Sequence, residues 1–503
     1  MELPGQAASY WTEISRPEFA PLAGGAKVDV AIIGGGWVGL LTADLLKRAG
    51  RTVAVLEARR VAAQVTGHTT AKLTSLHSLI YAELIRTVGE TTARLYGEAN
   101  EAGIRYVEQL AGERGIDCDF ARVSAYSYSE DGQKLAAIHE EVEAALRLGL
   151  PASFVAGPPL PFAVAGAVCF ENQARFHPLK FLMPIAAGIP GDGSHVFEQT
   201  RVFDVEPGNP HRVLTDGGTV WARDVVIATN LPFTLLGLHF ARVFPKRHAL
   251  LASRLAAGTL PEGMFISVDE PTFSIRPHPD PRGDVLITVG PAFKTGQGDT
   301  YAAFRALERF TRERFQVEEV LWRWGNQDYY SPDRIPLVGK LSVTTRRMYV
   351  ATGFSAWGLA NGAAAAQVLS DHILERPNPW AEMYDATRYR LRVTGKALLS
   401  ENFEVGKGWL RDHVNTWRLK DVCDVSRGEG AVCRHHGVPV AVYKAEDGSN
   451  HYLSPFCPHL GCMVSWNSAE KSWDCPCHGS RFSAQGELLE GPSVRDLERR
   501  SEE

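Results

Sequence analysis

The sequence predicts a multidomain protein in which an α/β domain of the nucleotide-binding type precedes a small C-terminal domain that holds a metal centre. Three observations lead to this prediction. The chain has 503 residues, which exceeds what a single hydrophobic core supports and corresponds to two or three domains of roughly 100 to 200 residues. A strand, a glycine turn, a helix and a second strand follow one another over residues 28–57. Six cysteine and histidine residues lie between Cys457 and His478, which is not the composition of a hydrophobic core.

The first of these units is predicted to bind a dinucleotide. The branched apolar run Val28–Ile33 forms a strand that leads into the turn Gly34–Gly39, which has the spacing G-x-G-x-x-G. Apolar residues then recur at helical spacing until Gly50, and Val53–Leu56 supplies a second strand that ends at Glu57. Such a turn places backbone N–H groups and a helix N-terminus against a pyrophosphate, while the acid accepts the ribose hydroxyls. The candidate contacts are Gly34, Gly36, Gly39 and Glu57.

The glycine turn alone does not separate NAD from FAD, but later segments do. Val225–Asn230 is a buried strand that ends in a small polar turn, and Tyr330–Gly339 precedes Met348–Gly362, whose glycines lead into an alanine-rich helix that ends near Glu375. Together these segments resemble the D-amino-acid oxidase superfamily, the glycine oxidase and sarcosine oxidase group of FAD enzymes. The resemblance covers residues 27–385 and implies FAD as the cofactor. Glycines there let the backbone approach the flavin, and the helix start places its positive end beside it.

The resemblance also implies a fold, namely a Rossmann-type α/β domain that binds FAD and an interleaved α+β substrate domain. A polar loop after Glu57 is expected to cover the flavin, and a strand over residues 200–205 is expected to cradle the adenine. The flavin-binding segments are expected at about 27–80, 150–235 and 330–380, and the substrate segments at about 81–149 and 236–329. The further FAD contacts that the resemblance implies are Thr69, Thr70, Lys72, Val202, Thr229, Gly353, Gly358 and Leu359.

The substrate segments are expected to combine helices with an antiparallel sheet. Residues 96–148 are expected to be mainly helical. Met264–Val268, Phe273–Ile275 and Val285–Val289 alternate like antiparallel strands. In the family this sheet covers the substrate. Arg276 on it is a candidate partner for a substrate carboxylate, because its planar guanidinium suits that group, although a surface arginine is an equally good interpretation.

Further candidates are weaker. His248 is a second catalytic candidate, beside Lys246, and both also fit ordinary structural roles. Sarcosine oxidases place an oxygen-activating lysine near this sheet, and the corresponding position here is Ser274, which favours a dehydrogenase. His68 is a candidate for covalent attachment of the flavin. A loop histidine bonded to backbone or water is the favoured interpretation of His68.

The C-terminal cysteines and histidines have the spacing of iron–sulfur ligands. Cys457 and His459 form a C-x-H pair, and Cys475 and His478 form a C-x-x-H pair. Two thiolates and two imidazoles are the ligand set of a Rieske [2Fe–2S] centre, whose potential lies at about −150 to +300 mV. A structural zinc site is the competing interpretation, but zinc ribbons space their cysteines as C-x-x-C, and this chain offers C-x-C and C-x4-C.

Residues 415–503 resemble the small all-β respiratory-type Rieske proteins as a whole. The resemblance implies that Cys462 and Cys477 form a disulfide and that the four spaced residues are the ligands. One departure is Phe482, where the respiratory proteins carry a tyrosine whose hydroxyl points to a ligand sulfur, while Ser480 keeps its hydroxyl. Donors to sulfur raise the potential, so we expect a potential below that of the respiratory proteins. The implied ligands are Cys457, His459, Cys475 and His478.

Composition and the remaining segments set further expectations. Hydrophobic residues make up 45%, charged residues 22%, and the net charge is −5, so neither nucleic acid nor an anionic membrane is an expected partner. No apolar run reaches the roughly 18 residues of a membrane span, and no secretory signal is recognised, so a cytoplasmic location is expected. Residues 1–26 are expected to form a tail and residues 386–414 a helical linker. Reduced core cysteines are expected at Cys118, Cys169, Cys423 and Cys433.

The combination of two redox groups suggests a function. A flavin takes two electrons as a hydride, whereas a Rieske cluster carries one, so the fusion is expected to separate the electrons. We expect an FAD-dependent dehydrogenase that oxidises a small amine or N-substituted amino acid and passes single electrons through the cluster to a soluble or membrane-bound acceptor. One alternative is an oxidase that uses oxygen directly, with the Rieske domain as a redox sensor or structural module. Another is a reductase in which an outside donor reduces the cluster first.

Overall fold

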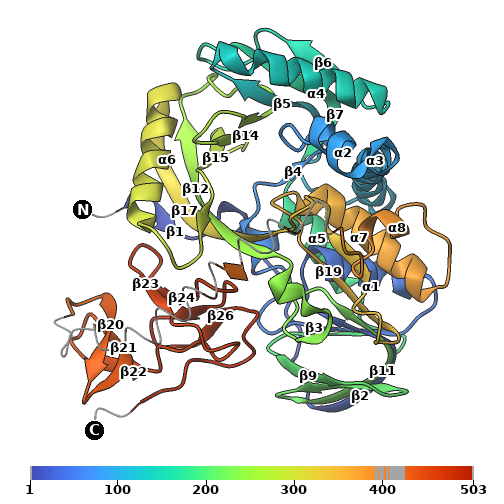
Figure 1. Ribbon diagram of the computed structural model, residues 1–503, viewed down its shortest axis with the longest axis vertical. Helices are drawn as coiled ribbons and strands as arrows, with labels where there is room; N and C mark the ends of the chain where they lie inside the picture. Colours follow the sequence, from blue (N-terminus) through green and yellow to red (C-terminus); the bar gives the residue numbers. More distant parts are fainter. Residues whose placement is uncertain (1–2, 391–394, 396–401, 404–405, 407–424, 501–503) are drawn as a thin grey trace.

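The computed structural model describes residues 3–390, 395, 402–403, 406 and 425–500. The described chain forms a large domain, which ends near residue 390, and a small C-terminal domain over residues 425–500 (Figure 1). The large domain is built on two sheets, and the C-terminal domain contains two smaller ones. Among the described helices, none combines the length and the apolar character needed to cross a bilayer.

The nucleotide-binding half of the large domain is an eight-stranded sheet with the central order β18-β19-β11-β2-β3-β8. Strand β2 pairs in parallel with both β3 and β11. Its residues Val30–Ile33 are apolar without interruption because a central parallel strand is buried on both faces. The strands are β2 (Gly24–Ile33), β3 (Val53–Leu56), β8 (His195–Phe197), β9 (Val202–Glu206), β10 (His211–Thr215), β11 (Gly218–Ile227), β18 (Leu337–Lys340) and β19 (Met348–Thr352).

The substrate half is an eleven-stranded mixed sheet with the main order β1-β17-β12-β15-β14-β13-β5-β7-β4. The predicted antiparallel arrangement of β13, β14 and β15 is confirmed. The longest antiparallel pair joins β12 to β17. The strands are β1 (Gln6–Ala7), β4 (Lys72–Leu73), β5 (Ala121–Ser129), β6 (Ala152–Val155), β7 (Gly166–Arg175), β12 (Phe244–Leu255), β13 (Met264–Ser267), β14 (Ser274–His278), β15 (Val285–Val289), β16 (Phe293–Lys294) and β17 (Val317–Tyr330).

Helices cover both sheets of the large domain (Figure 1). Among them, α7 is rich in alanine because the helices α1 and α3 pack closely against it. A Cβ atom at Gly362 of α7 would lie 2.7 Å from Trp37 of α1, and one at Gly103 of α3 would lie 2.3 Å from the Ala360 carbonyl oxygen of α7. The helices are α1 (Trp37–Arg48), α2 (Tyr81–Val88), α3 (Glu90–Arg114), α4 (Leu135–Arg147), α5 (Pro178–Ala187), α6 (Thr300–Arg314), α7 (Gly358–Ile373) and α8 (Ala381–Tyr384), with 3-10 turns η1 (Tyr10–Thr12), η2 (Val65–His68), η3 (Gly132–Lys134) and η4 (Leu236–Ala241).

The C-terminal domain is all-β, as the sequence predicts. Strands β20 to β22 form a three-stranded antiparallel sheet, and β23 to β26 form a four-stranded one. The loops between these short strands carry the cysteine and histidine pairs. The strands are β20 (Glu429–His435), β21 (Val438–Lys444), β22 (Asn450–Leu453), β23 (Ser465–Asn467), β24 (Ser472–Asp474), β25 (Arg481–Ser483) and β26 (Leu488–Glu490).

Several segment predictions need correction. The stretch over residues 96–148 is mainly helical as expected, but it also contains β5, which pairs with β7 in the substrate sheet. Strand β7 itself lies in a segment expected to bind the flavin. Residues 386–390 of the expected helical linker are not helical and pack on the large domain, where Arg388 pairs with Asp333 at 2.9 Å. Most of the remaining linker lies outside the described residues.

The N-terminal segment is not a tail. Strand β1 adds to the edge of the substrate sheet in parallel with β17. The Trp11 side chain is fully buried, and its indole N–H donates to the Thr69 carbonyl oxygen at 2.6 Å. Residues that were predicted to form an N-terminal tail therefore contact the polar loop after β3.

Replacing Trp11 by alanine should lower the stability of the large domain by about 3–5 kcal/mol, because truncating a buried tryptophan leaves a cavity. Gln6→Ala, on the exposed strand β1, is the matched control and should change the stability little. Denaturant unfolding followed by intrinsic fluorescence measures both. Equal midpoints for the two variants would show that the N-terminal segment contributes nothing to the fold.

Candidate active site and metal centre

The glycine turn between β2 and α1 is held tight by close backbone contacts. A Cβ atom at Gly34, whose φ is 107°, would lie 2.5 Å from the Ala228 carbonyl oxygen, and one at Gly39 would lie 1.9 Å from the Gly34 carbonyl oxygen. Neither position tolerates a side chain. Gly36 caps α1 without a side-chain hydrogen bond, and the Thr66 hydroxyl accepts from the Trp37 N–H at 3.0 Å. The positive end of the helix is thus only partly satisfied within the chain.

The acid at the end of β3 closes this turn. Glu57 accepts hydrogen bonds from the backbone N–H groups of Gly35 and Arg59, both at 2.9 Å. Burial raises the pKa of Glu57. A carboxylate has about four acceptor sites, and Glu57 also lines the neighbouring cavity, so it keeps capacity to accept ribose hydroxyls there.

A single cavity of about 790 Å³ joins the two halves of the large domain, a size within the roughly 300–1,000 Å³ of small-molecule sites. Most of the predicted cofactor contacts line it, whereas Gly39 and Gly353 do not. The starts of α1 and α7 both open on it, and the N-cap residue of neither helix makes a side-chain hydrogen bond, although the Thr66 hydroxyl accepts from the first N–H of α1. These features fit a flavin dinucleotide. The predicted residues in the lining are Gly34, Gly36, Glu57, Thr69, Thr70, Lys72, Val202, Thr229, Gly358 and Leu359.

The C-terminal domain completes the wall of this cavity. Its segment over residues 488–494, which begins with β26, lines the cavity together with the glycine turn and the strands β12 and β17. The Gln64 side-chain amide donates to the Leu489 carbonyl oxygen at 2.8 Å and so ties the segment to the large domain. The site is therefore built from both domains.

His248, predicted as a catalytic candidate, lies in the cavity lining on β12. Its Nδ1 lies 3.1 Å from the Gly290 carbonyl oxygen, and its Nε2 lies 3.0 Å from the Tyr330 hydroxyl. Burial lowers the pKa of His248. A neutral imidazole that donates from Nδ1 accepts the Tyr330 proton at Nε2. Both ring nitrogens are thus engaged, and the arrangement orients Tyr330 toward the cavity.

The structure contradicts the role predicted for Arg276. Its side chain is fully buried and lies outside the cavity lining. The guanidinium donates to the Phe176 carbonyl oxygen at 2.8 Å and lies 5.0 Å from the centre of the Trp11 ring. Burial lowers the pKa of Arg276 to about 9. The N-terminal segment therefore covers the face that a substrate carboxylate would need.

Lys72 changes the interpretation of Ser274. Its ammonium group donates to the Phe265 carbonyl oxygen at 2.5 Å and contacts the Ser274 hydroxyl, and both Lys72 and Ser274 line the cavity. Burial, and next the charge of Arg276, lower the pKa of Lys72 to about 7. A lysine amine thus lies at the position where the sequence comparison finds a serine. The inference of a dehydrogenase from Ser274 is therefore not supported.

His68 takes the structural role that the sequence favours. Its Nδ1 lies 2.9 Å from the Gln64 carbonyl oxygen, and the side chain is not part of the cavity lining. The carbonyl oxygen of His68 accepts a hydrogen bond from the Trp324 indole at 2.8 Å. His68 therefore shapes the loop instead of contacting the cavity.

The four predicted metal ligands form a pair of thiols and a pair of imidazoles on two loops of the C-terminal domain. Cys457 and Cys475 are buried free thiols within hydrogen-bond reach of each other. The rings of His459 and His478 lie 5.0 Å apart, centre to centre. Neither ring nitrogen of His459 has a hydrogen-bond partner among the described residues, which is unusual for a buried polar group without a ligand. Burial lowers the pKa of both imidazoles, and neutral imidazole is the form that binds metal.

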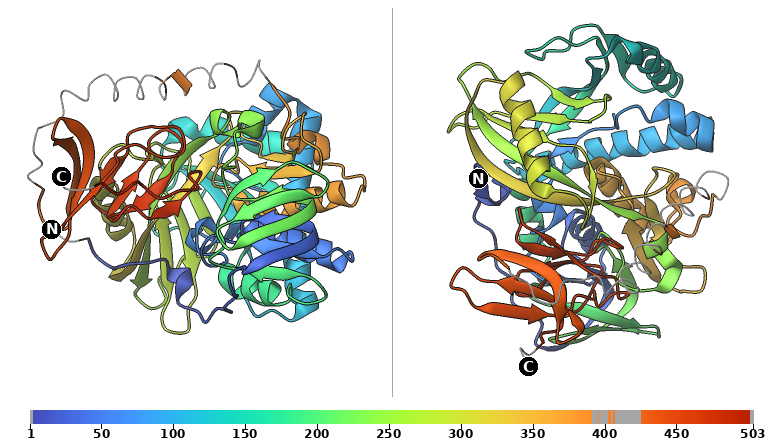
Figure 2. Two further views of the ribbon diagram at one scale, coloured as in Figure 1. Left: turned by 90° about the horizontal axis from the view of Figure 1, so that it is seen from below. Right: turned by 60° about the vertical axis from the view of Figure 1, so that its left-hand side comes forward.

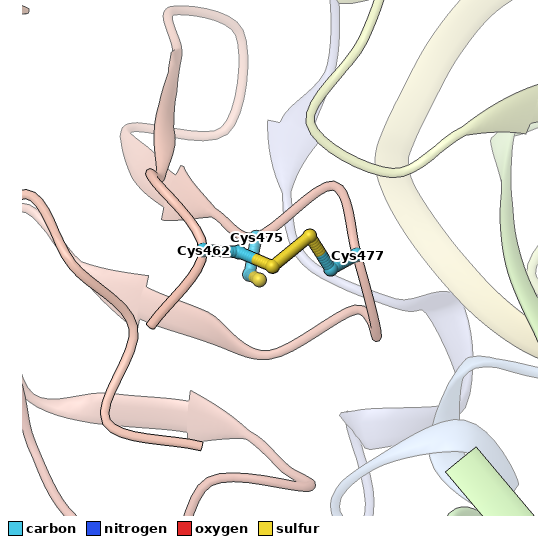
Figure 3. Close-up of side chains that lie close together, drawn as sticks. All are labelled: Cys462, Cys475 and Cys477. Atoms are coloured by element: carbon cyan, nitrogen blue, oxygen red, sulfur yellow. A yellow bond between two sulfur atoms is a disulfide. The ribbon is translucent and has the colours of Figure 1, made fainter. Parts of the chain in front are cut away.

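The predicted disulfide between Cys462 and Cys477 is present, with Cα atoms 6.4 Å apart. Figure 3 shows the thiol of Cys475 beside this bond. The three sulfur atoms lie within 4.8 Å of one another, but two of them are consumed by the disulfide. Among the other cysteines, Cys118 and Cys169 are free and buried as expected. Cys433 is disulfide-bonded, so its prediction as a reduced thiol is wrong, and Cys423 lies outside the described residues.

A buried ionic network fastens the C-terminal domain to β12. Arg247 is fully buried and donates to both carboxylate oxygens of Glu470, at 2.7 and 2.9 Å. Glu490 joins Arg247 at 3.4 Å to Arg481 at 2.7 Å, and Arg481 also pairs with Asp474 at 2.9 Å. A buried charge without a partner is costly, so the network favours one docked arrangement.

Strand β17 directly contacts the metal-ligand loop, which carries the predicted ligands Cys475 and His478. Gln327 donates from its amide to the Gly479 carbonyl oxygen at 2.8 Å, and Tyr329 donates from its hydroxyl to the His478 carbonyl oxygen at 2.9 Å. The ring of Phe240, in η4, lies edge-on 5.4 Å from His478 and 6.0 Å from His459. The two imidazoles therefore face the large domain, against which the C-terminal domain lies (Figure 2).

The β12–β17 pair thus has two functional faces. Successive side chains of a strand point to opposite sides. Lys246 and His248 of β12 line the cavity, whereas Arg247 between them binds the C-terminal domain. On β17, Asp328 lines the cavity, and Tyr329 borders it while also donating to the metal-ligand loop. The β12–β17 pair therefore contacts both the cavity and the metal-ligand loop.

Sequence reasoning missed several of these residues. Asp328, Tyr329 and Glu490 were not candidates, and Arg247 was not considered. Their only local signal is the alternation of polar and apolar residues along the two strands. That pattern becomes informative only when the pairing of β12 with β17 and the docking of the C-terminal domain are known.

Comparisons with known proteins agree with this division. Residues 29–372 match the family described as FAD dependent oxidoreductase (DAO), and residues 415–499 match the Rieske [2Fe-2S] domain. The match of the C-terminal domain removes the structural zinc site as an interpretation. A Bacillus subtilis (strain 168) protein named as a Rieske 2Fe-2S iron-sulfur protein, YhfW, is 34% identical over 494 residues, which cover 97% of this chain and 96% of that protein.

Two further comparisons concern the large domain. Gamma-glutamylputrescine oxidoreductase of Escherichia coli (strain K12) is 29% identical over 208 residues, which cover 40% of this chain and 49% of that protein. The crystal structure of glycine oxidase from Geobacillus kaustophilus superposes with a TM-score of 0.61 and 18% identity, covering 72% of this chain and 99% of that one. The predicted fold of the large domain is therefore confirmed.

The buried ring of Phe482, opposite Trp473 in the four-stranded sheet, allows a direct test of the metal centre. Phe482→Tyr should raise the midpoint potential, because a hydroxyl near the ligand sulfur stabilises the more negative reduced state. Redox titration followed by paramagnetic resonance measures it, with Tyr443→Phe on β21 as the control for a hydroxyl change elsewhere in the domain. An unchanged potential in Phe482→Tyr would refute the assignment of this position.

Proposed function

Because the chain belongs to the FAD dependent oxidoreductase family and carries a Rieske [2Fe-2S] domain, we propose that it oxidises a small amine or N-substituted amino acid and passes the electrons from FAD singly through the cluster. The two cofactors follow from the two families. The observation that carries the proposal is the shared cavity, whose wall includes residues 488–494 of the Rieske domain. An external soluble or membrane-bound acceptor would then oxidise the reduced cluster.

Several residues have proposed roles toward FAD. The turn Gly34–Gly39 and the start of α1 receive the pyrophosphate, and Glu57 accepts the ribose hydroxyls. Val202 borders the adenine, and Gly358 at the start of α7 borders the flavin ring. FAD supplies the chemistry of accepting a hydride from a C–H bond. The protein positions the substrate and excludes water from the cavity.

The proposed cluster ligands are the pair of thiols and the pair of imidazoles on the two loops of the C-terminal domain. Cys457 and Cys475 would bind one iron, and His459 and His478 the other. Their thiols lie together and their imidazoles face η4 of the large domain. The cluster supplies one-electron transfer. Ser480 keeps its hydroxyl beside Cys457, where a donor to sulfur favours the reduced state.

The β12–β17 pair is the proposed route between the two groups. Tyr329 lines the cavity and binds the backbone of the ligand His478. Gln327 binds the next residue, Gly479. Electron exchange needs a short and fixed separation, and these bonds, with the buried Arg247 network, hold the cluster domain against the flavin cavity.

An amine substrate is supported by the named relatives, since glycine oxidase and gamma-glutamylputrescine oxidoreductase carry amines in their names. The cavity offers Lys246 as the cation for a substrate carboxylate, in place of Arg276. Lys246 lies over the Tyr330 ring, 5.0 Å from its centre. Arg334 also lines the cavity, but Glu83 already pairs with it at 2.5 Å.

A direct reaction with oxygen is the second candidate function. The observation that favours it is the Lys72 amine beside Ser274 in the cavity, which is the place where sarcosine oxidases carry their oxygen-activating lysine. In that case the Rieske domain would act as a redox sensor or a structural module. The rate of reduced flavin reoxidation by oxygen, compared with its rate in Lys72→Met, measures this contribution.

Anaerobic addition of glycine, N-methylglycine and putrescine to the holoenzyme tests the main proposal. We expect one of these amines to bleach the flavin absorbance and then to produce the paramagnetic signal of the reduced cluster. Flavin bleaching with a cluster that stays oxidised would favour the oxidase. A flavin that stays oxidised with every amine, while an external donor reduces the cluster and then the flavin, would favour the reductase.

The docking network gives a separate prediction. Arg247→Met should slow reduction of the cluster at least tenfold relative to reduction of the flavin, because breaking a buried ionic network costs about 3–5 kcal/mol. Arg254→Met is the matched control, since Arg254 lies on the same strand and pairs with Glu319 at 3.3 Å on the surface, where a pair contributes about 0–1 kcal/mol. Stopped-flow absorbance measures both rates. An unchanged ratio of the two rates in Arg247→Met would contradict the proposed route.

A further inference from the structure

One carboxylate in the cavity has no role in the mechanism so far. Asp328 lies on β17 between Gln327 and Tyr329, whose side chains bind the Rieske domain. Gln327 and Tyr329 also border the cavity, but their polar groups are directed at the Rieske loop, whereas the alternation of the strand turns Asp328 to the opposite face, where it lines the cavity. Its side chain is therefore directed at the space in which the substrate would lie.

Asp328 also differs from the other carboxylates of this cavity, which within the described chain are Glu57, Glu270 and Glu490. Glu57 accepts two backbone N–H groups, and Glu490 is paired with Arg481 and Arg247. Glu270 is exposed at the rim. Asp328 is buried, and the described residues give it one hydrogen bond, a long one of 3.4 Å from the Asn326 amide.

The groups around Asp328 leave its charge largely uncompensated. Lys246 is its cross-strand neighbour, but the ammonium group lies over the Tyr330 ring instead. His248 is engaged with Tyr330 and Gly290, and its pKa is lowered by burial. The Rieske residue Glu490 adds a negative charge. Burial, and next the charge of Glu490, raise the pKa of Asp328 to about 7.

Amine oxidation needs a group with these properties. A free amine is mainly a cation at neutral pH, and the lone pair that forms the C=N bond is available only after the nitrogen loses a proton. A buried carboxylate attracts the cation, and a pKa near the working pH lets it accept the proton. Lys72 does not fit this role, because its amine already donates to Phe265 and contacts Ser274.

We propose that Asp328 binds the ammonium group of the substrate and receives its proton before hydride transfer. The N–H bond breaks and the proton moves to the Asp328 carboxylate. The adjacent C–H bond then breaks, its electron pair and hydrogen pass as a hydride to oxidised FAD, and the nitrogen lone pair forms the C=N bond. This assignment rests on the proposed function as an amine oxidoreductase and adds its cation-binding and proton-accepting residue.

Binding of methylammonium to the oxidised holoenzyme tests the proposal without turnover. The perturbation of the flavin absorbance gives the dissociation constant at pH 6 and pH 8. Asp328 carries its charge above its pKa, so wild-type binding should tighten about tenfold from pH 6 to pH 8. Asp328→Asn keeps the shape of the side chain and should bind more weakly with no such change. Asp328→Glu should restore the pH dependence in part, and Glu318→Gln, which changes an exposed acid of β17 outside the cavity lining, should behave like the wild type.

The reactive amine of the anaerobic series supplies the second readout. The ratio of flavin reduction rate to dissociation constant should fall tenfold per pH unit below about pH 7 in the wild type, and Asp328→Asn should lose this acidic limb together with about 100-fold of the ratio. An acidic limb that persists in Asp328→Asn, or methylammonium binding that does not depend on residue 328 or does not occur, would overturn the proposal. A wild type whose flavin no amine reduces would instead refute the proposed function.

Discussion

The antiparallel pairing of β12 with β17 is the constraint on which the rest of the molecule depends. This pair joins the long strands of the substrate sheet, and its two faces belong to different redox sites. On β12, Lys246 and His248 line the cavity and Arg247 between them binds the Rieske domain, whereas on β17 Gln327 and Tyr329 border the cavity and also bind the Rieske domain. A shift of the pairing by one residue would exchange the two faces and remove both sites at once.

Docking and cavity formation are consequently linked. The Arg247 network and the hydrogen bonds of Gln327 and Tyr329 hold the Rieske domain against the β12–β17 pair. Residues 488–494 of that domain then close the cavity. Glu490 belongs to both structures, because it pairs with the arginines and also raises the pKa of Asp328. Docking of the Rieske domain therefore affects the pKa of Asp328, the group proposed to receive the substrate proton.

The sequence was most informative for sites that are defined by the spacing of neighbouring residues. The turn Gly34–Gly39 and the cysteine and histidine pairs could be located from the sequence because neighbouring residues define them, and the Cys462–Cys477 disulfide is present as the resemblance implied. Arg276 was misassigned because Trp11, from the far end of the chain, covers it. Asp328 was missed because its meaning depends on a cross-strand partner and on a domain that follows it. Contacts between distant segments carry no local signal.

Intramolecular electron transfer across the β12–β17 pair is the central claim, and flash photolysis measures this transfer most directly. A light pulse with an external photoreductant places an electron on the flavin of the oxidised holoenzyme, and the absorbance and paramagnetic signal of the cluster are followed. The account predicts that the cluster becomes reduced at a first-order rate that does not change when the protein concentration is raised tenfold. A rate that rises in proportion to protein concentration, or a flavin that stays reduced beside an oxidised cluster, would contradict it.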